Sequence, residues 1–427
     1  MKTKIGVFPA GTEIGLEINR ALKYSTHIEL YGFSSLSDHS KYVYRNYVDN
    51  LPFYNDENFL NEFNKSIKEN EIQYIFPAND DVQLFLTENY DKINAEIITT
   101  DIKTVRVCRS KITTYNLFKD TEFTPKFFEK ISDVKKFPIF AKPDIGQGAK
   151  GAIIINNFNE LNCLLRSEEK YVFCEYLPGE EYTIDCFTDF HGELRVCKMR
   201  NRKRIREGIS VRSEILLTDN EVLKIAKIIN DNLKFNGAWF FQLKKDINDK
   251  YKLLEIAPRI SGTMGLSRSL GINFPLLTIF NKMRIPIKII ENKYKIEVDR
   301  ALISRYSLDF DYNVVYVDLD DTLIIKNKVN KLLMMFIYQS INNNIKIILM
   351  TKHIHNILET LSRMKINKDI FDEIININML EKKSDFLVHK KSIFIDDSFS
   401  ERYDVYSNLN IPVFDSSEVE CLIDWRE

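Results

Sequence analysis

The pattern of apolar and polar residues predicts alternating strands and helices over the first hundred residues. Residues 4–8 form a short apolar run that we expect to be a buried strand, followed by a turn and a helix ending near Leu22. A second strand is expected at 28–32. Residues 59–69 carry apolar side chains at helical spacing and precede another strand at 74–77. Strands and helices alternating in this way build a parallel α/β sheet.

An acidic turn, Asn79-Asp80-Asp81, follows the strand at 74–77. Turns at the carboxyl ends of parallel strands often face ligands. The alternative is that Asn79 and Asp80 only cap the next helix, because short polar side chains accept hydrogen bonds from the first turn. The sequence favours the capping interpretation.

The middle of the chain, residues 137–258, is richer in strand-like segments. Helices are expected within it at 157–166 and 219–233, which is the pattern of an α+β lobe. A mixed polar segment, residues 286–312, then connects this lobe to the last part of the chain.

The last part of the chain begins with an apolar strand at Asn313 and again alternates between the two kinds of element. Helices are predicted at 331–342 and 354–364, and strands at 345–350 and 392–395. This order is typical of a small doubly wound α/β domain.

Composition points to an ordinary globular protein of two or three domains. The 427 residues carry a formal net charge of −1, with 44% hydrophobic and 28% charged residues. This balance excludes wholesale disorder and any overall attraction to nucleic acid or membrane. The basic residues between Arg195 and Arg206 have no interleaved aromatic platform, so we interpret them as a solvated strand face.

Cysteine usage and the N-terminus predict a cytoplasmic protein. The six cysteines form no CxxC pair and no metal-type spacing with the six histidines, so free thiols in a reducing compartment are expected. The N-terminus lacks the apolar core of a signal peptide, and no apolar run approaches the roughly 18–20 residues of a membrane span.

A short apolar strand ending at Lys142 leads into a glycine-rich loop. Its glycines can adopt positive φ and let backbone N–H groups approach phosphate oxygens; they are Gly146, Gly148 and Gly151. The loop is not a Walker A motif, because Ala152 stands where that motif needs lysine. A hairpin turn with a solvated lysine is the alternative.

Three later stretches bear on this loop. A strand ending in Glu175-Tyr176-Leu177 can offer polar groups to a purine edge, and Glu181 can accept from ribose hydroxyls. Oxygen ligands such as Gln242 and Glu255 suit Mg²⁺. Arg259, four residues after Glu255, suits a bidentate grip on a phosphate or acyl phosphate. Taken singly, Glu255 and Arg259 also fit a surface salt bridge.

Together these stretches resemble the ATP-grasp superfamily, in particular its carbamoyl-phosphate-synthetase-like and biotin-carboxylase-like branch, over roughly residues 1–295. The resemblance implies that Lys111, Lys142 and the glycine loop contact nucleotide phosphates. It implies an adenine site at Glu175 and Leu177 and a ribose site at Glu181. It also implies Mg²⁺ ligands at Gln242 and Glu255, and a catalytic arginine at Arg259. The cofactors expected are ATP and Mg²⁺.

One position departs from the family pattern. Many members have Asn two residues after the metal-binding Glu, whereas this chain has Ala257, which cannot ligate a metal. A second Mg²⁺ would then depend on Glu255, water and ATP. The same resemblance puts one or two arginines in a pocket for the acceptor carboxylate, and our choices are Arg200 and Arg206.

The activity that the resemblance implies is ligation of a small-molecule carboxylate to an amine. The carboxylate attacks the γ-phosphate of ATP, and the amine then displaces phosphate from the acyl phosphate. Two alternatives stay open: a kinase that stops at a stable phosphorylated product, and a nucleotide-binding regulatory module in which Ala257 reflects lost catalysis. Relatives are often dimers, so a homodimer is an open expectation.

The most specific motif is Asp318-Leu319-Asp320-Asp321-Thr322, which ends an apolar strand. Strand alternation would place Asp318 and Asp320 on one face, where like charges crowd together unless a cation is present. Downstream, one strand ends in Thr351, the pair Lys382-Lys383 follows, and another strand ends in Asp396-Asp397. The alternative is that these residues only cap helices.

These motifs resemble those of haloacid-dehalogenase-like (HAD) phosphatases, over roughly residues 313–427. The resemblance implies that Asp318 is the nucleophile, that Asp320 is the general acid and base, and that Thr351 and Lys383 hold the phosphoryl oxygens, with Lys382 the competitor. Asp318, Asp320 and Asp396 would form the Mg²⁺ site, with Asp397 an alternative further ligand. About thirty residues separate Asp320 from Thr351, too few for a large cap.

The prediction is therefore a bifunctional enzyme whose second half hydrolyses a phosphate ester. Its expected parts are an α/β domain that precedes the ATP-grasp fold, the ATP-grasp domain, a linker, and a capless HAD-like doubly wound domain. Their expected bounds are 1–105, 106–295, 296–312 and 313–427.

Overall fold

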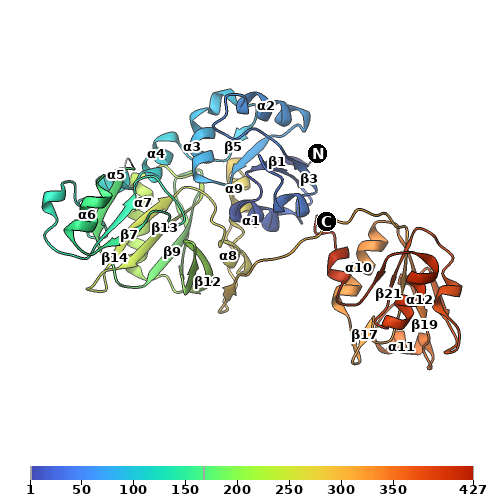
Figure 1. Cartoon of the computed structure of the whole chain (residues 1–427). Helices are drawn as coiled ribbons and strands as arrows, with labels where there is room; N and C mark the ends of the chain where they lie inside the picture. The colour runs from blue at the N-terminus through green and yellow to red at the C-terminus, as the bar shows by residue number, and fades with distance from the viewer. Residues whose placement is uncertain (1, 167–168, 427) are drawn as a thin grey trace. The chain divides into compact units, whose positions relative to one another are not determined.

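The computed structural model describes residues 2–166 and 169–426. The chain divides into two compact units, unit 1 (Met1–Leu302) and unit 2 (Ile303–Glu427), each with its own sheets and core (Figure 1). None of the helices in the described ranges is long and apolar enough to cross a membrane.

Unit 1 begins with a five-stranded parallel sheet in the order β3-β2-β1-β4-β5. Its strands are β1 (Thr3–Phe8), β2 (Ile28–Phe33), β3 (Asn46–Val48), β4 (Tyr74–Pro77) and β5 (Glu96–Ile97). The helices are α1 (Glu13–Leu22), α2 (Phe59–Glu69), α3 (Asp80–Glu88) and α4 (Ile102–Arg109). The predicted strand–helix alternation of this region is confirmed.

Helices cover both faces of this sheet because alternate residues of β1 point to opposite sides. Ile5 and Val7 pack in one apolar cluster with Ile18 of α1. Phe8 packs in another cluster with Phe59 and Phe63 of α2. The turn between β1 and α1 and the turn between β4 and α3 therefore emerge at the same edge of the sheet.

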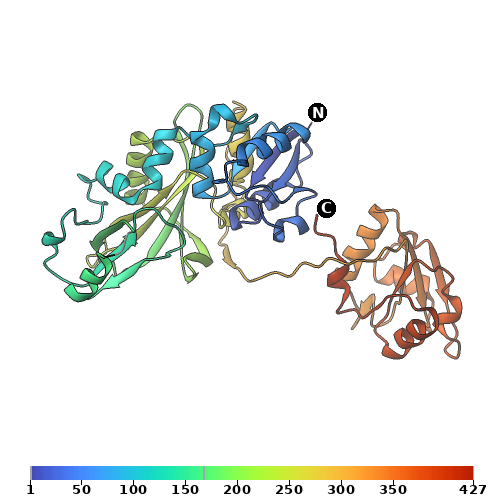
Figure 2. The ribbon, with the colours of Figure 1, turned by 45° about the horizontal axis from the view of Figure 1, so that its top comes forward.

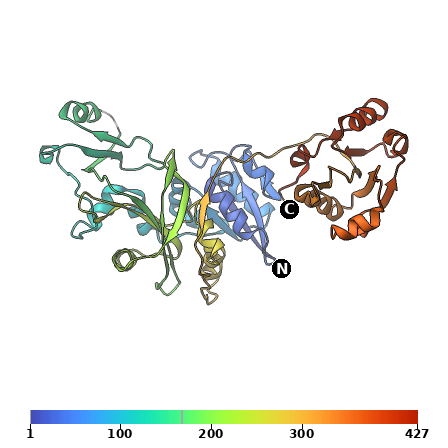
Figure 3. The same cartoon turned by 90° about the horizontal axis from the view of Figure 1, so that it is seen from below.

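A small antiparallel sheet, in the order β7-β6-β8, carries the glycine loop between β6 and β7. It follows α5 (Lys111–Leu117) and consists of β6 (Ile139–Pro143), β7 (Ile153–Ile155) and β8 (Tyr171–Glu175), with α6 (Phe158–Leu164). Figure 3 shows this sheet and α6, in teal, at the end of unit 1 away from the N-terminal sheet.

A larger antiparallel sheet has the order β11-β12-β10-β9-β13-β14, with β15 paired to β12. Its strands are β9 (Glu181–Thr188), β10 (Leu194–Asn201), β11 (Arg204–Arg206), β12 (Ile209–Leu216), β13 (Gly237–Lys245), β14 (Tyr251–Ala257) and β15 (Glu297–Asp299). The helices of this region are α7 (Asn220–Asn232), α8 (Gly265–Ser269) and α9 (Phe274–Lys282). Figures 1 and 2 show this green sheet beside the blue N-terminal sheet.

One boundary differs from the sequence prediction. Residues 297–299 were expected in a linker covering 296–312, but they form β15, which pairs with Arg212, Ser213 and Glu214 of β12. The strand is only three residues long and has no apolar alternation, so its pattern could not be distinguished from that of a polar connector. Unit 1 accordingly extends to Leu302.

Unit 2 contains a five-stranded parallel sheet in the order β20-β19-β16-β21-β22. Its strands are β16 (Val314–Val317), β19 (Lys346–Thr351), β20 (Glu373–Asn376), β21 (Ser392–Ile395) and β22 (Val413–Phe414). The helices are α10 (Lys331–Asn342), α11 (Ile357–Arg363) and α12 (Phe399–Leu409). Val315 and Val317 pack on one face and Val314 and Tyr316 on the other, as the predicted doubly wound arrangement requires.

Between Asp320 and the start of β19 at Lys346, the chain holds only a small hairpin and α10. The hairpin consists of β17 (Ile324–Ile325) and β18 (Lys328–Val329). Six short 3₁₀ helices complete the described secondary structure: η1 (His39–Tyr42), η2 (Tyr90–Lys92), η3 (Ile131–Asp133), η4 (Lys368–Ile370), η5 (Lys383–Phe386) and η6 (Val419–Leu422).

Candidate functional sites

A cavity of about 760 Å³ lies in unit 1 where its sheets meet. The starts of α1, α3 and α5, the glycine loop and the strands β13 and β14 all contribute to its wall. Of the residues singled out in the sequence, those lining it are Asn79, Asp80, Lys111, Gly146, Gly148, Arg200, Gln242, Glu255, Ala257 and Arg259.

Lys111 and the glycine loop form one wall. Lys111 is the first residue of α5, and its Nζ donates to the carbonyl oxygens of Asp144 at 3.2 Å and Gly146 at 3.3 Å. Burial lowers the pKa of Lys111, although the carboxylate of Glu255 acts in the opposite direction. Gly148 has a φ of +65° and Gly151 a φ of +71°, a region that favours glycine.

Lys142 is buried beside this wall and does not line the cavity in the structure. Its Nζ donates to the Tyr115 hydroxyl at 2.7 Å and to the Leu254 carbonyl at 2.9 Å. Burial lowers the pKa of the Lys142 ammonium. The alternative of a solvated lysine after a hairpin is therefore wrong, since the side chain is enclosed.

Gln242 and Glu255 lie directly opposite each other on the antiparallel strands β13 and β14. Opposite residues of an antiparallel pair project to the same face, so the amide and the carboxylate share one side of the sheet. Both line the cavity. Ala257 is two residues further along β14 and contributes only a methyl group to the wall.

Arg259 is held by Asp80, far away in the sequence. The guanidinium donates through Nε and Nη2 to the two carboxylate oxygens at 2.7 and 2.6 Å. Burial works against ionisation of Asp80, but Arg259 brings the pKa of that carboxyl below its usual value, and the pKa of Arg259 is raised in turn. The guanidinium also lies over the Phe240 ring, 5.2 Å from its centroid.

In the acidic turn Asn79-Asp80-Asp81, the first two residues therefore have different roles. The Asn79 side chain caps α3 by accepting from the backbone N–H groups of Asp81 and Val82. The capping interpretation is correct for Asn79. For Asp80 it is wrong, because that carboxylate holds Arg259 at the cavity.

The residues expected at the adenine and ribose do not line the cavity. The Glu175 carboxylate accepts from the backbone N–H of Lys126 at 2.8 Å, and Leu177 is buried. Glu181 is paired with Arg202 at 2.9 Å.

The two arginines chosen for an acceptor pocket have different positions. Arg200 lines the cavity but is fully engaged, donating to both carboxylate oxygens of Asp185 at 2.9 and 3.2 Å and to the Ser261 hydroxyl at 3.1 Å. Arg206 is exposed on β11, outside the cavity lining, because β11 is the outermost strand there. The structure therefore brings Arg200, but not Arg206, to the cavity.

Arg202, two residues after Arg200, does line the cavity. Its Nη2 donates to the Gly208 carbonyl at 2.7 Å, while its Nε is buried and has no hydrogen-bond partner among the described residues. Burial lowers the pKa of Arg202. The alternation of β10, continued one residue past its end at Asn201, could have revealed it, since residues 200 and 202 share one face of an extended chain.

Arg300 is a further cavity residue that sequence reasoning missed. It follows β15, and its guanidinium pairs with the Glu13 carboxylate at the start of α1. Its position depends on the pairing of β15 with β12, so no local motif identifies it.

The glycine loop meets the turn between β11 and β12. Gly208 has a φ of +74°, and a Cβ built on it would lie 2.2 Å from the backbone of Gly148. The β11–β12 turn therefore has no room for a side chain at Gly208. The two turns therefore close one side of the cavity together.

The remaining basic residues of the 195–206 segment are largely paired with acids. Lys198 pairs with Glu291, Lys203 with Glu214 and Glu297, and Arg204 with Asp299. These pairs fit the interpretation of this segment as a solvated strand face rather than a nucleic-acid surface.

A second candidate site lies in unit 2, at the carboxyl ends of its parallel strands. Lys383, in η5, donates to Asp318 Oδ1 and to Asp396 Oδ2, both at 2.6 Å. All three side chains are buried. Lys382 is exposed and lies 3.5 Å from Asp404, so the structure brings Lys383 rather than its neighbour into the cluster.

Burial shapes the ionisation of this cluster. It raises the pKa of Asp318 to about 7, with Lys383 opposing the shift and Asp396 adding to it. Burial also raises the pKa of Asp396. For Lys383 burial acts downward, but the two carboxylates raise its pKa overall.

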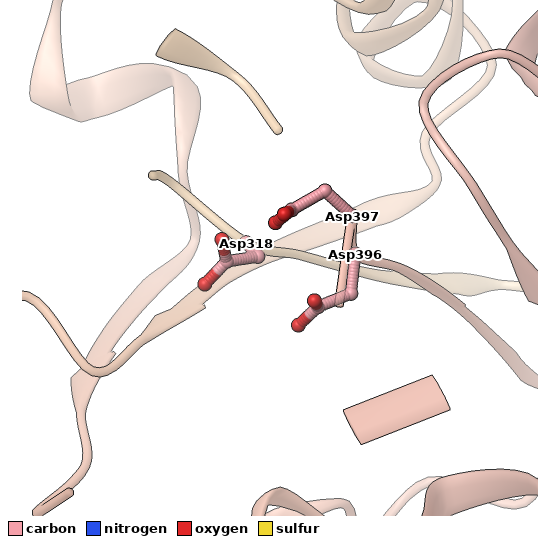
Figure 4. Close-up of side chains that lie close together, drawn as sticks. All are labelled: Asp318, Asp396 and Asp397. Carbon is pink, nitrogen blue, oxygen red and sulfur yellow. The ribbon is translucent and has the colours of Figure 1, made fainter. Parts of the chain in front are cut away.

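Asp318, Asp396 and Asp397 could share a metal ion. Each offers one carboxylate oxygen, and these oxygens lie within 4.8 Å of one another (Figure 4). The Asp320 carboxylate lies outside this group. The predicted alternation fails there, because β16 ends at Val317 and both aspartates follow in the turn.

Asp320 instead faces a histidine. Its Oδ2 lies 2.8 Å from Nδ1 of His353, which follows β19 by two residues. Thr351, the last residue of β19, is buried, and its hydroxyl has no hydrogen-bond partner among the described residues. His353 was not singled out in the sequence, because a lone histidine after a strand carries no motif.

Comparisons with known proteins place the fold of unit 1. Residues 167–314 match the family described as "ATP-grasp in the biosynthetic pathway with Ter operon". Among solved structures, the chain is similar to N5-carboxyaminoimidazole synthetase from Staphylococcus aureus complexed with ADP. The two are 16% identical with a TM-score of 0.57, covering 68% of this chain and 80% of that one.

Two further structures agree. Biotin carboxylase from Campylobacter jejuni is 14% identical with a TM-score of 0.55, covering 67% of this chain and 72% of that one. L-amino acid ligase from Bacillus licheniformis is 19% identical with a TM-score of 0.52, covering 66% and 74%. No curated protein sequence matches the chain. These likenesses establish a mixed α/β ATP-grasp fold.

Proposed function

We propose that unit 1 is an ATP-dependent carboxylate–amine ligase and that unit 2 is a magnesium-dependent phosphatase of the HAD type. The observation that carries the first half is the cavity of unit 1. It gathers Lys111, the glycine loop, the Gln242–Glu255 pair and Arg259 around one space of about 760 Å³.

The glycine-loop side of the cavity suits the triphosphate of ATP. Lys111 supplies a positive charge, and the N–H groups of a loop with left-handed glycines suit phosphate oxygens. The carboxylate of Glu255 is near enough to Lys142 to act electrostatically on its ammonium group, in the direction that raises its pKa. We assign Lys142 to the nucleotide phosphates as well. Glu175, Leu177 and Glu181 are assigned to the adenosine; for Glu181 this requires its ion pair with Arg202 to open.

The donor set on β13 and β14 fits Mg²⁺. Mg²⁺ is usually bound by one or two protein oxygens together with phosphate oxygens and water. Gln242 and Glu255 offer an amide and a carboxylate oxygen from the same face of the sheet. Ala257 has no side-chain atom that can bind a metal. The side chains at this position therefore suit one Mg²⁺ ion better than two. When bound, Mg²⁺ neutralises charge on the phosphates.

The chemistry follows from the charges that surround the cavity. An oxygen of the substrate carboxylate attacks the γ-phosphorus, and the bond from that phosphorus to the β,γ-bridging oxygen breaks, releasing ADP. Arg259 and Lys111 stabilise the charge of the transferred group. An amine then attacks the acyl carbon, loses a proton and expels phosphate, leaving an amide.

Two observations support ligation over simple phosphorylation. The structural relatives include an L-amino acid ligase and a carboxyaminoimidazole synthetase, which are named for ligase-type products. The cavity also extends past the nucleotide side to Arg202, whose buried Nε has no hydrogen-bond partner among the described residues and could donate to an acidic acceptor.

The ligase proposal is tested by measuring ADP release with panels of carboxylates and amines. We expect release that requires Mg²⁺ and both substrates, and loss of at least about 100-fold of it in Lys142→Ala and Glu255→Ala. Lys136→Ala, at an exposed position just before β6, is the matched control. Release by the two cavity variants at the wild-type rate would contradict the proposal.

The phosphatase half is supported by the buried Asp318–Lys383–Asp396 cluster. A nucleophilic carboxylate beside a lysine ammonium suits attack on a phosphate ester, since the cation offsets the charge of the phosphoryl oxygens. The unpartnered hydroxyl of Thr351 suits a further phosphoryl oxygen. The carboxylates of Asp318, Asp396 and Asp397 converge closely enough to hold Mg²⁺, which when bound would neutralise the same charge.

The hydrolysis has two steps. A carboxylate oxygen of Asp318 attacks phosphorus and the bond to the leaving oxygen breaks, while Asp320 gives that oxygen a proton. Water then attacks the aspartyl phosphate, Asp320 takes a proton from the water, and the bond between phosphorus and Asp318 breaks. Phosphate leaves and both carboxyl groups return to their starting states.

The phosphatase proposal is tested with Asp318→Asn. This variant should lose Mg²⁺-dependent hydrolysis of p-nitrophenyl phosphate and retain ADP release by unit 1. Asp321→Asn is the control, because Asp321 is exposed with a φ of +52° that asparagine also adopts. Full hydrolysis by Asp318→Asn would contradict the assignment.

A further inference from the structure

We propose that His353 is a positioning residue that holds Asp320 in the orientation needed for proton transfer to the leaving group. The inference rests on the phosphatase function proposed for unit 2 and adds a residue to it. It is carried by a chain of two side-chain contacts, from Asp320 to His353 and from His353 to Thr360.

Asp320 needs such a contact because it is poorly fixed by packing. More than half of its side-chain surface is exposed, at 54%, whereas the nucleophile Asp318 is 7% exposed and is clamped by Lys383. Asp320 also lies beyond the end of β16, where its backbone forms only an isolated bridge with Ile324, and that bridge leaves the carboxyl group free to rotate. An exposed carboxyl in a turn samples several rotamers unless a hydrogen bond selects one.

His353 is well placed to select that rotamer. Its side chain is 6% exposed, and Nδ1 lies 2.8 Å from Asp320 Oδ2. The other ring nitrogen, Nε2, lies 2.9 Å from the hydroxyl of Thr360 on α11. Both ends of the ring are therefore held, and α11 supplies a rigid anchor from the core of unit 2, where Leu361 packs.

The contact also sets which carboxyl oxygen is free. With Oδ2 engaged by the imidazole, Oδ1 is the oxygen that carries the transferred proton. In the first step that proton passes from Oδ1 to the leaving oxygen as the phosphorus–oxygen bond breaks, which yields an alcohol and the Asp320 carboxylate. In the second step Oδ1 regains a proton from the attacking water.

The consequence is a dependence on the leaving group. General acid catalysis accelerates the departure of a basic alkoxide or phenolate by roughly 10²–10⁴-fold, but a leaving group that departs as a stable anion needs no proton. Loss of the histidine contact should therefore slow the hydrolysis of esters of weakly acidic alcohols more than that of other esters. If His353 had only a structural role, its loss would slow the hydrolysis of all esters to the same extent.

The experiment compares phenyl phosphate with p-nitrophenyl phosphate, two esters of nearly the same shape, using the full chain with Mg²⁺. For His353→Ala we expect kcat/KM to fall about 100-fold on phenyl phosphate and less than about 3-fold on p-nitrophenyl phosphate. His353→Asn should recover much of the loss, because its amide N–H can occupy the place of Nδ1–H. Thr360→Val, which removes only the anchor, should give a smaller loss with the same selectivity.

The matched control is His355→Ala, two residues away on the same loop and exposed, whose ring contacts that of His353 without touching Asp320. It should leave the ratio of the two rates unchanged. Equal losses on both esters in His353→Ala, His353→Asn and Thr360→Val would overturn the inference while leaving the phosphatase function intact. Absence of hydrolysis of both esters by the wild-type chain would overturn the phosphatase function and the inference together.

Should His353→Ala fail to fold, the other two variants decide the question. Thr360→Val keeps the histidine and nearly the same volume, so selective loss on phenyl phosphate still supports the positioning role and equal loss still contradicts it. A crystal structure of the His353→Asn chain adds a direct readout: Asp320 should keep its wild-type rotamer, with Oδ2 accepting from the side-chain amide of the introduced asparagine.

Discussion

At the scale of single residues, two side chains that are adjacent in the sequence can have unrelated roles, and these roles become visible only in the folded structure. Asn79 and Asp80 are both ordinary capping residues in sequence terms, and capping was foreseeable because it is local. The pair of Asp80 with Arg259 joins residues 179 positions apart, so no local pattern contains it. The same holds for His353, which depends on Asp320 from another strand end.

The Asp80–Arg259 pair yields a prediction for stability. Asp80→Asn should lower the unfolding free energy by about 3 kcal/mol near neutral pH, because it leaves a largely buried guanidinium without its counter-charge. Glu88→Gln, at the other end of α3, is the control; Glu88 is 38% exposed and pairs with Arg106, which is 61% exposed, so a loss below about 1 kcal/mol is expected. Urea unfolding of the two variants measures both effects.

The pKa of Asp80 gives the sign of the pH dependence. Because folding lowers that pKa, the ionised carboxyl stabilises the fold at pH values above the ordinary carboxyl range. This stabilisation is lost as the pH falls through the depressed pKa of the folded state. The difference in unfolding free energy between wild type and Asp80→Asn should therefore shrink in acid, and a difference that grew would contradict the ion-pair explanation.

Substitution of Thr351 should change the proposed phosphatase activity without lowering the stability of the fold. Its buried hydroxyl has no partner among the described residues, so Thr351→Val should leave the unfolding free energy unchanged or raise it by up to about 1 kcal/mol. Hydrolysis of p-nitrophenyl phosphate should nevertheless fall about 100-fold, because a donor to the phosphoryl oxygens is lost.

Thr322→Val provides the contrast for that variant. The Thr322 hydroxyl contacts the Asp397 carboxylate at 3.1 Å and accepts from the Asp397 backbone N–H at 2.9 Å. Its removal should cost about 1 kcal/mol of unfolding free energy. A comparable loss in Thr351→Val would mean that its hydroxyl has a structural role.

At the scale of elements, the sequence was a good guide wherever apolar periodicity was long enough. The helix predicted at 331–342 coincides with α10, and the helix predicted at 59–69 coincides with α2. Short polar strands such as β11 and β15 carried no such pattern. The prediction that Asp318 and Asp320 share a face extrapolated strand geometry past Val317, where the chain already turns.

The contact between the glycine loop and the β11–β12 turn yields a prediction at this scale. Gly208→Ala should lower nucleotide affinity, because its Cβ would collide with the backbone of Gly148. Gly192→Ala is a matched control: Gly192 also has a positive φ, +86°, but no heavy atom lies within 4 Å of its Cβ position.

Both glycine variants should lose about 1 kcal/mol of unfolding free energy from backbone strain. Only Gly208→Ala should also weaken the binding of ATP, measured by titration calorimetry with Mg²⁺ present. Equal ATP affinity in the two variants would show that the β11–β12 turn has no part in closing the cavity.

At the scale of the whole molecule, the chain consists of two independent cores. The apolar clusters of unit 1 contain only residues up to Ile289, and those of unit 2 begin at Phe310. We expect limited proteolysis between residues 303 and 309 to leave two folded fragments. Each should keep the activity of its own site, as judged by ADP release and by ester hydrolysis after chromatographic separation.

Loss of either activity on cleavage would mean that one unit needs the other to fold or to act. The sequence predicted two α/β portions around a mixed lobe because each has its own periodicity. The end of unit 1 was predicted several residues too early. The last strand of unit 1, β15, is held by hydrogen bonds rather than by apolar contacts, and a strand held in this way gives no recognisable pattern of apolar residues in the sequence.

The pairing of Arg300 with Glu13 has a consequence for biosynthesis. Glu13, the residue that starts α1, leaves the ribosome well before its partner, which is encoded almost three hundred codons later. Nascent chains that stop short of β15 thus possess most of the ATP-grasp scaffold with one flank of the cleft unbuilt. We therefore expect the cavity of unit 1 to be complete only after translation has passed the end of unit 1, with unit 2 folding as a separate, later event.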